Sequence, residues 1–295
     1  MHHYATATSG TLVDHKLSAR VWRVVVPQEA QSFPFLMHSI LAISALHLSH
    51  LKSSNQREHL SLLETAMNQH NTALTTFRKT VPRLTPSNSS AVLVFSHLAI
   101  FFAFGSPWVP ETATMCKDSL AGLLGIFDLL RRAMESLRPA WGWLKAGTTG
   151  PLLQHGAHTI GPEHLPQHLR CALEAIKSLA EDKSGEDDDR RRMYLAEIVQ
   201  LRDSFVMAET RHEDWCVTLR FPMIVSEAFI RLVRVEDPMA LVIMAHYCIL
   251  LHRAPGRWWA KRCSIDVIIN ISQILNPHWR SFILLPLQAA ELHGL

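Results

Sequence analysis

Residues 33–51 are the stretch that most restricts the fold of this chain. They read FPFLMHSILAISALHLSHL, which is apolar on nearly every face of a helix and interspersed with small residues such as Ser39, Ala42 and Ser44. A helix of this composition is packed on all sides inside a helical domain. The stretch therefore predicts a buried helix that needs helical neighbours.

The following segment supplies such a neighbour. Its apolar residues are spaced alternately by three and four, which predicts a long amphipathic helix that starts near Gln56. Two adjacent helices that bury this much surface indicate an all-α core. The stripe consists of Leu60, Leu63, Met67, His70, Leu74, Phe77 and Val81.

The size and charge of the chain favour one helical domain with a large interior. Its 295 residues are 48% hydrophobic, and no break in composition divides them. We therefore expect a single compact domain, residues 1–295, of about ten helices around a central buried helix. A net charge of +3, evenly spread, is too small for a nucleic-acid-binding surface.

The sequence lacks the residue patterns of metal sites, disulfide frameworks and common enzymes. Its five cysteines form no Cys-x-x-Cys pair, and its 18 histidines are scattered. No phosphate-binding glycine loop, nucleophile elbow or zinc-protease motif occurs. We expect no metal and no cofactor.

No segment is a strong candidate for membrane insertion or secretion. The most hydrophobic run, Ala91 to Phe104, has about fourteen residues, whereas a spanning helix needs about 20. The start of the chain has no basic and then apolar run of the secretory type. The expected location is intracellular, in the cytoplasm and/or the nucleus.

Several phrases, in order along almost the whole chain, resemble a known family. Together they look like the C-terminal regulatory domain of fungal binuclear-zinc-cluster transcription factors, in particular the sterol-uptake-control type. The phrases are LMHSILAISALHL at 36–48, HxxALxxFR at 70–78, NxxAVxxFS at 88–96, GPL at 150–152, PMALVIMAHY at 238–247 and WW at 258–259.

The resemblance implies a helical ligand-binding domain, and it implies a helical turn at Trp22–Val26, whose β-branching alone suggests a strand. The chain departs from the family because the six clustered cysteines of the DNA-binding module are missing. We therefore expect no direct nucleic-acid contact by this chain. It is either a fragment of a longer regulator or a free-standing relative; a start directly at the family's first helix favours a trimmed or reduced protein. Lys261, Arg262 and Cys263 also differ from the residues common after the family's tryptophan pair.

Clustered aromatic and methionine side chains are the candidate ligand site. An apolar cavity that they line would bind a sterol- or terpenoid-like molecule, as the resemblance implies, and His246, Tyr247 or Ser96 would orient it. Ordinary core packing is the alternative for each residue. For His70 and His97, a hydrogen bond in the core is favoured over a catalytic role. The candidate ligand-binding residues are Phe101, Phe104, Trp108, Trp141, Trp143, Met244, His246, Tyr247, Trp258 and Trp259.

Three functions fit these patterns. The first is a ligand-sensing regulatory domain in which an apolar molecule shifts the balance between two helix arrangements, exposing or hiding a surface for homodimerisation or another partner. The second is a cofactor-free enzyme of fungal secondary metabolism that folds a terpenoid or polyene for cyclisation or cycloaddition by positioning alone. The third is an interaction domain without a ligand. The sequence leaves open whether the chain is an enzyme.

Overall fold

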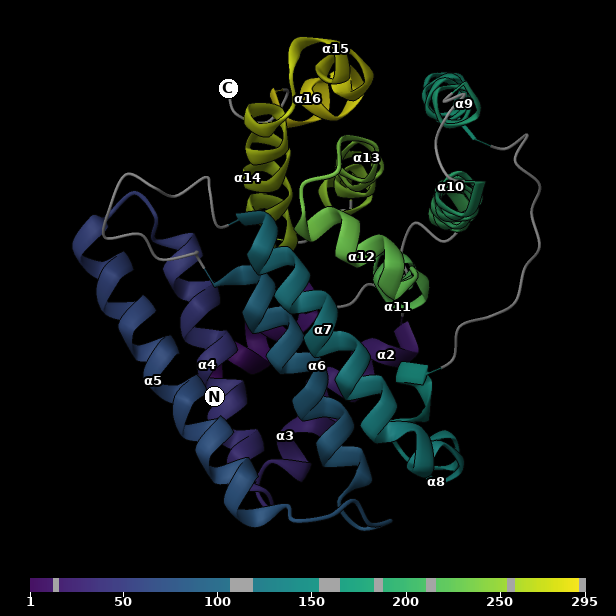
Figure 1. Cartoon of the computed structure of the whole chain (residues 1–295). Helices are drawn as coiled ribbons and strands as arrows, with labels where there is room; N and C mark the ends of the chain where they lie inside the picture. The colour runs from purple at the N-terminus through teal and green to yellow at the C-terminus, as the bar shows by residue number, and fades with distance from the viewer. Residues whose placement is uncertain are drawn as a thin grey trace. The chain divides into compact units, whose positions relative to one another are not determined.

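The computed structural model describes residues 1–12, 16–106, 119–153, 165–182, 188–210, 216–253 and 258–291. Every regular element in these ranges is helical (Figure 1), which confirms the all-α fold expected from the sequence. The N-terminal elements are η1 (Tyr4–Thr8), α1 (Ser9–Leu12), α2 (Lys16–Arg20), η2 (Val21–Val25), α3 (Val26–Glu29), α4 (Pro34–Leu51), α5 (Gln56–Thr80), α6 (Ser89–Gly105), α7 (Ser119–Leu137), η3 (Arg138–Ala140), α8 (Trp141–Ala146) and η4 (Gly150–Leu153). The remaining elements are α9 (Gln167–Glu181), α10 (Asp188–Thr210), α11 (Cys216–Ile224), α12 (Glu227–Arg234), α13 (Pro238–Arg253), α14 (Trp258–Ile274), α15 (Pro277–Arg280), η6 (Ser281–Ile283) and α16 (Leu284–Glu291).

The chain divides into two compact units, and each is described by itself. Unit 1 comprises Met1–Pro107, Asp128–Gly156 and Gly256–Trp259. Unit 2 comprises Trp108–Phe127, Ala157–Pro255 and Ala260–Leu295.

Unit 1 is built on the packed pair α4 and α5, which lie side by side in Figure 1. Helix α4 begins at Pro34, whose fixed φ suits a first turn. Helix α5 begins after Asn55, whose side chain accepts a hydrogen bond from the Glu58 backbone N–H at 3.4 Å. One position of the predicted stripe is wrong, because Leu60 is 53% exposed. It lies in the first two turns of α5, where Leu63 is the first stripe residue that is buried.

Helix α6 crosses the core of unit 1, and most of its residues are buried, which agrees with the predicted buried helix. The residue that precedes α6 does not cap the helix with its side chain. Asn88 precedes the helix, but its side chain makes no hydrogen bond to the first turn. Instead, its Oδ1 accepts from the Thr85 N–H at 2.8 Å and its amide donates to the Arg83 carbonyl at 3.0 Å. Asn88 therefore orders the preceding loop.

The Trp22 segment is helical, as the family resemblance implied. Val21–Val25 form a π-helical turn in which Trp22 is fully buried. The hydroxyl of Tyr4 donates to the Trp22 carbonyl oxygen at 3.1 Å, and Tyr4 lies in a second π-helical turn. This hydrogen bond therefore links the two π-helical turns at the N-terminal end of unit 1.

By length and composition, α4 is the one described helix that could cross a membrane. Buried residues make up 61% of it, however, because it packs against α5 and α6 inside unit 1. A core helix of a globular unit passes the same test, so this single match is weak support for a membrane span.

Unit 2 surrounds α13, in which every residue from Met239 to His252 is buried. Helices α10, α12 and α16 pack against it. Asp237 caps its start, since Oδ1 accepts from the Ala240 N–H at 3.0 Å and from the Tyr194 hydroxyl at 2.7 Å. A helix that is apolar all round is stable only with such complete coverage.

Candidate functional site

The structure divides the predicted site residues between the two units. Those of unit 1 lie on α6, on α8 and at the start of α14, whereas those of unit 2 all lie on α13. Trp108 lies outside the described residues. The unit 1 residues are Phe101, Phe104, Trp141, Trp143, Trp258 and Trp259, and the unit 2 residues are Met244, His246 and Tyr247.

In unit 1, the rings of Trp22, Phe101, Phe104 and Trp259 form one buried group, the α6 aromatic group. The Trp259 ring centroid lies 4.9 Å from that of Phe101 and 5.6 Å from that of Phe104. Trp22 joins the group at 5.6 Å from Phe101. The sequence analysis did not select Trp22 as a site residue, because the β-branched residues around it do not indicate that its side chain is buried. Its indole Nε1 is buried, and no described residue forms a hydrogen bond with it.

Trp258 makes a polar contact with the N-terminal helices. Its Nε1 donates to the Thr11 Oγ1 at 3.0 Å, and its ring stacks on His47 at a centroid distance of 5.0 Å. The Nδ1 of His47 lies 3.1 Å from the Thr8 Oγ1. Burial lowers the pKa of His47 to about 4, with smaller contributions from the nearby His3 and His50. This cluster joins the first helices of unit 1 to α4 and to Trp258.

The two tryptophans of α8 lie apart from the α6 aromatic group. Trp143 is 45% exposed. The ammonium of Lys145 lies 5.9 Å from the Trp141 ring centroid, a cation–π distance. Neither ring contacts Phe101, Phe104 or Trp259 among the described ring pairs. The structure therefore does not bring them to the buried aromatic residues.

In unit 2, His246 is held inside α13 by its own helix. Its Nδ1 lies 2.9 Å from the carbonyl oxygen of Val242, and the residue is 1% exposed. Burial lowers the pKa of the imidazole to about 4, although the bond to Val242 acts in the opposite direction. The other ring nitrogen, Nε2, is buried and has no hydrogen-bond partner among the described residues.

Tyr247 is the second polar residue in this apolar interior. Its ring stacks on Phe221 at 5.2 Å and meets Phe127 edge-on at 5.4 Å. Its hydroxyl is buried and finds no hydrogen-bond partner in the part of the chain that the structure describes. Burial raises the pKa of the phenol well above its ordinary value, and the neighbouring thiols of Cys248 and Cys263 add to this effect. We call His246 and Tyr247 the α13 polar pair; Met244, also fully buried, lies on the same helix.

A surface hollow lies at the start of α5, and its lining differs from that of the predicted apolar cavity. It has a volume of about 390 Å³, is open to solvent and has a mixed polar lining. Its lining residues are Asn55, Arg57, Glu58, Ser61 and Leu62, none of which the sequence singled out for ligand binding. The apolar cavity thus stays a prediction.

Among the described residues, no three or more His, Cys, Asp or Glu side chains are placed to hold a metal ion. Within the same ranges, buried and partly buried histidines lie at hydrogen-bond distance from hydroxyl, amide or carbonyl oxygens or stack on rings, for example His70 on Phe102 at 4.0 Å. The local chemistry is that of a helical core with a few polar atoms in it.

The described residues thus form an all-helical class of protein with a few polar atoms in its apolar interior. Residues 1–126 match the family described as the fungal specific transcription factor domain. The resemblance to the regulatory domain of fungal transcription factors is thereby confirmed.

Three relatives extend the comparison. A Zn(2)-C6 fungal-type transcription factor of Gibberella zeae is 22% identical over 315 residues, covering 100% of this chain and 61% of the relative. Sterol uptake control protein 2 of Saccharomyces cerevisiae is 29% identical over 143 residues, 48% of this chain and 13% of the relative. The Zn(2)-C6 fungal-type transcription factor afumD of Aspergillus fumigatus is 24% identical over 268 residues, 84% of this chain and 65% of the relative. The chain thus spans less than two thirds of the length of each of these relatives.

Proposed function

We propose that this chain is a ligand-sensing regulatory domain of a fungal transcription regulator. The ligand is an apolar small molecule, sterol- or terpenoid-like, and the domain works in the cytoplasm or nucleus without touching nucleic acid itself. The family match and the relatives named for sterol uptake control support this assignment. The proposal covers all of residues 1–295. Ligand binding exposes or hides a surface through which two copies of the chain form a homodimer.

The observation that carries the proposal is the α13 polar pair. Two adjacent, almost fully buried side chains each keep a polar atom without a partner in an apolar interior. Leaving such an atom unsatisfied costs about 1–3 kcal/mol. Since native proteins pair most buried polar groups, each exception calls for an explanation such as stored strain or a bound partner.

The geometry of His246 determines whether the polar group of the ligand must donate or accept a hydrogen bond. The Val242 carbonyl oxygen can only accept, so Nδ1 carries the proton of the neutral imidazole. Nε2 is then an acceptor, and its natural partner is a hydroxyl group. An apolar alcohol meets this requirement, whereas a ketone of the same shape offers Nε2 no proton.

A two-state mechanism follows. His246 Nε2 and Tyr247 Oη are closely surrounded by protein atoms in this arrangement, so the ligand binds to a second, more open arrangement of the helices around α13. The unpaired atoms destabilise the closed arrangement and lower the cost of opening. Burial of ~400 Å² of ligand surface provides about 10 kcal/mol before association costs. Shifting the two states from 1:99 to 99:1 requires about 5.5 kcal/mol of differential affinity.

The test is a thermal-shift screen of the purified chain with sterols and terpenoid alcohols, each beside its matched ketone. A ligand at a hundred times its dissociation constant stabilises the fold by about 2.7 kcal/mol. We expect the alcohols to raise Tm more than the ketones, and Tyr247→Phe and His246→Leu to reduce the gain. Native mass spectrometry after organic extraction checks for a ligand carried through purification. No stabilisation by any compound and no carried molecule would reject the ligand-sensing role.

A further inference from the structure

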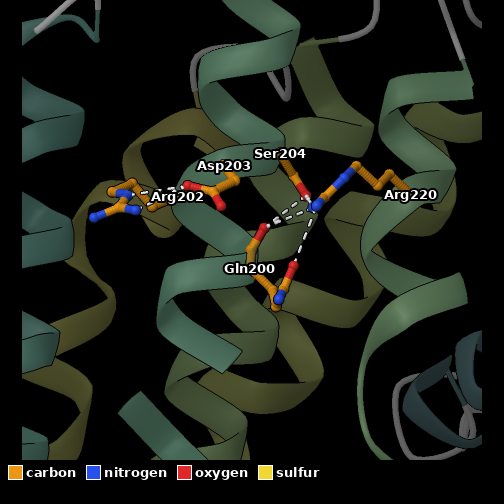
Figure 2. Close-up of polar contacts among 5 residues, drawn as sticks. All are labelled: Gln200, Arg202, Asp203, Ser204 and Arg220. Carbon is orange, nitrogen blue, oxygen red and sulfur yellow. Dashed lines mark hydrogen bonds and ion pairs between the residues drawn. The ribbon is translucent and has the colours of Figure 1, made fainter. Parts of the chain in front are cut away.

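A second polar arrangement lies in unit 2, at the contact between α10 and α11. Arg220 of α11 reaches across to α10 and is held there by Gln200 and Ser204 (Figure 2). Its Nη1 donates to the Gln200 carbonyl oxygen at 3.3 Å and to the Ser204 Oγ at 3.2 Å. Its Nη2 donates to the Gln200 Oε1 at 3.2 Å.

These three bonds use one end of the guanidinium group. Arginine has five N–H donors in a rigid fork, and Nε–H together with the outer N–H of Nη2 forms a second edge. This Nε edge makes none of the hydrogen bonds found for Arg220. Two parallel donors at this spacing match the two oxygens of a carboxylate.

Every acceptor that holds Arg220 is neutral, which distinguishes it from its neighbour. Arg202, also in Figure 2, donates from Nε and Nη2 to the Asp203 carboxylate at 3.2 and 3.0 Å. No carboxylate of the described residues forms an ion pair with Arg220. Glu197, one turn before Gln200 on α10, accepts instead from the Ser226 backbone N–H at 2.9 Å. Within the described ranges, this partly buried positive charge therefore has no counter-ion.

The surroundings fix the position of Arg220. Ser204 is fully buried, and its hydroxyl also donates to the Gln200 carbonyl oxygen at 2.8 Å. The guanidinium group is therefore pre-oriented by α10, while the Arg220 residue itself remains partly exposed. A donor that is already fixed loses little side-chain entropy when it binds a ligand.

We propose that the Nε edge of Arg220 is a binding site for the carboxylate of a small organic acid. The carboxylate accepts two hydrogen bonds, from Nε–H and from Nη2–H, and supplies the missing negative charge. The site is distinct from the α13 polar pair and does not depend on the apolar ligand. Because the acid bonds to a residue that already joins α11 to α10, its binding strengthens that contact.

The test follows the Nε–H signal of Arg220 by NMR in the full chain labelled with ¹⁵N-arginine, the signal being assigned by its loss in Arg220→Lys. Acetate and succinate are titrated at constant ionic strength against sodium chloride, with inorganic phosphate as a separate arm. We expect a saturating shift with the carboxylates and none with chloride. A stronger response to phosphate than to either carboxylate would overturn the choice of ligand.

The matched variants are Arg220→Lys and Arg202→Lys, read by carboxylate-dependent change in Tm. Lysine keeps the charge but cannot present two parallel donors, so Arg220→Lys should weaken carboxylate binding about tenfold or more. Because the charge of Arg202 is already paired with Asp203, Arg202→Lys should bind carboxylates as the unsubstituted chain does. A non-saturating shift of the Arg220 signal, or equal binding by both variants, would overturn the proposal. Neither result bears on the apolar ligand.

Discussion

The Nδ1 atom of His246 lies 2.9 Å from the carbonyl oxygen of Val242, one helical turn earlier in α13. This bond within one helix holds the imidazole in the core of unit 2 and fixes which ring nitrogen carries the proton. A protonated imidazole would need partners for two N–H groups, and only one is available. The core of unit 2 therefore accepts His246 in its neutral form only.

Acid should destabilise the protein well above the pH at which carboxylates titrate. Burial lowers the pKa of His246 to about 4 from an ordinary value of 6.5. Between these values the unfolded chain binds more protons than the folded one, so the free energy of unfolding falls as pH falls from about 6.5 to 4. For one fully buried histidine the slope reaches about 1.4 kcal/mol per pH unit. Urea unfolding at pH 7.5, 6 and 5 measures it.

Two variants isolate the contribution of His246. His246→Leu should flatten the pH dependence in proportion, although His47 and His70, whose pKa values burial also lowers to about 4, keep part of it. His278→Gln, at an exposed position of unit 2, should leave the slope unchanged. An identical slope in His246→Leu and the unsubstituted chain would mean that His246 is protonated in the folded state.

Two buried tyrosines should respond oppositely to loss of the hydroxyl. Tyr247→Phe removes an unpaired buried hydroxyl and should stabilise the ligand-free protein by about 1 kcal/mol. Tyr194 is equally buried, but its hydroxyl donates to Asp237 at 2.7 Å. Tyr194→Phe should therefore cost about 1.5–3 kcal/mol, the value of a hydrogen bond to a charged group. Chemical denaturation of both variants measures the free energy of unfolding. A comparable loss of stability in both would show that the Tyr247 hydroxyl has a hydrogen-bond partner.

The end of α12 offers a stabilising substitution. Glu236 has a φ of 59°, the left-handed conformation that follows many helices. Its N–H donates to the Val233 carbonyl oxygen at 3.1 Å, and that of Asp237 donates to Leu232 at 2.9 Å, which together form a Schellman motif. Glycine adopts this conformation without strain, so Glu236→Gly should raise the free energy of unfolding by about 0.5–1 kcal/mol.

The control lies in the middle of the same helix. Arg231→Gly, at an exposed position of α12, should lower the free energy of unfolding by about 1 kcal/mol, because glycine is a poor helix former. Opposite signs for the two glycine variants are expected in thermal or urea unfolding. Loss of stability in Glu236→Gly would mean that the Glu236 side chain makes a contact worth more than the strain.

Helix positions could be predicted from the sequence because local signals specify them. Pro34, Asn55 and Pro238 stand at or just before the starts of α4, α5 and α13. The sequence analysis placed the first helix within residues 33–51 and the start of the second near Gln56, and it included Pro238 in a family phrase. Leu60 shows the limit of periodicity. The stripe selects one face of α5 but does not reveal where α4 ends and stops covering that face.

The candidate site was harder to predict because it depends on tertiary packing. Phe101, Phe104 and Trp259 do come together, but Trp141 and Trp143 do not join them, and Tyr247 belongs to the other unit. Clustering of aromatic residues along a sequence says nothing about which helices pack together. Arg220 was missed for the same reason, since one arginine among many becomes notable only when its neighbours are known.

Gly105, the last residue of α6, touches the aromatic group that it helps to build, so it should tolerate no side chain. A Cβ atom at this position would lie 3.0 Å from the Cβ of Trp259, 3.1 Å from the Trp258 ring and 3.3 Å from the Leu46 Cδ2. Contacts this short force the two tryptophans or α4 to move, and overpacking of this kind costs about 1–3 kcal/mol. Gly125, within α7, has nothing within 4 Å of its Cβ position. Gly125→Ala should instead stabilise by up to about 1 kcal/mol, because alanine favours helix. Urea unfolding monitored by tryptophan fluorescence measures both changes. If Gly105→Ala stabilised the protein, the packing around Gly105 would have space for a methyl group, contrary to the distances above.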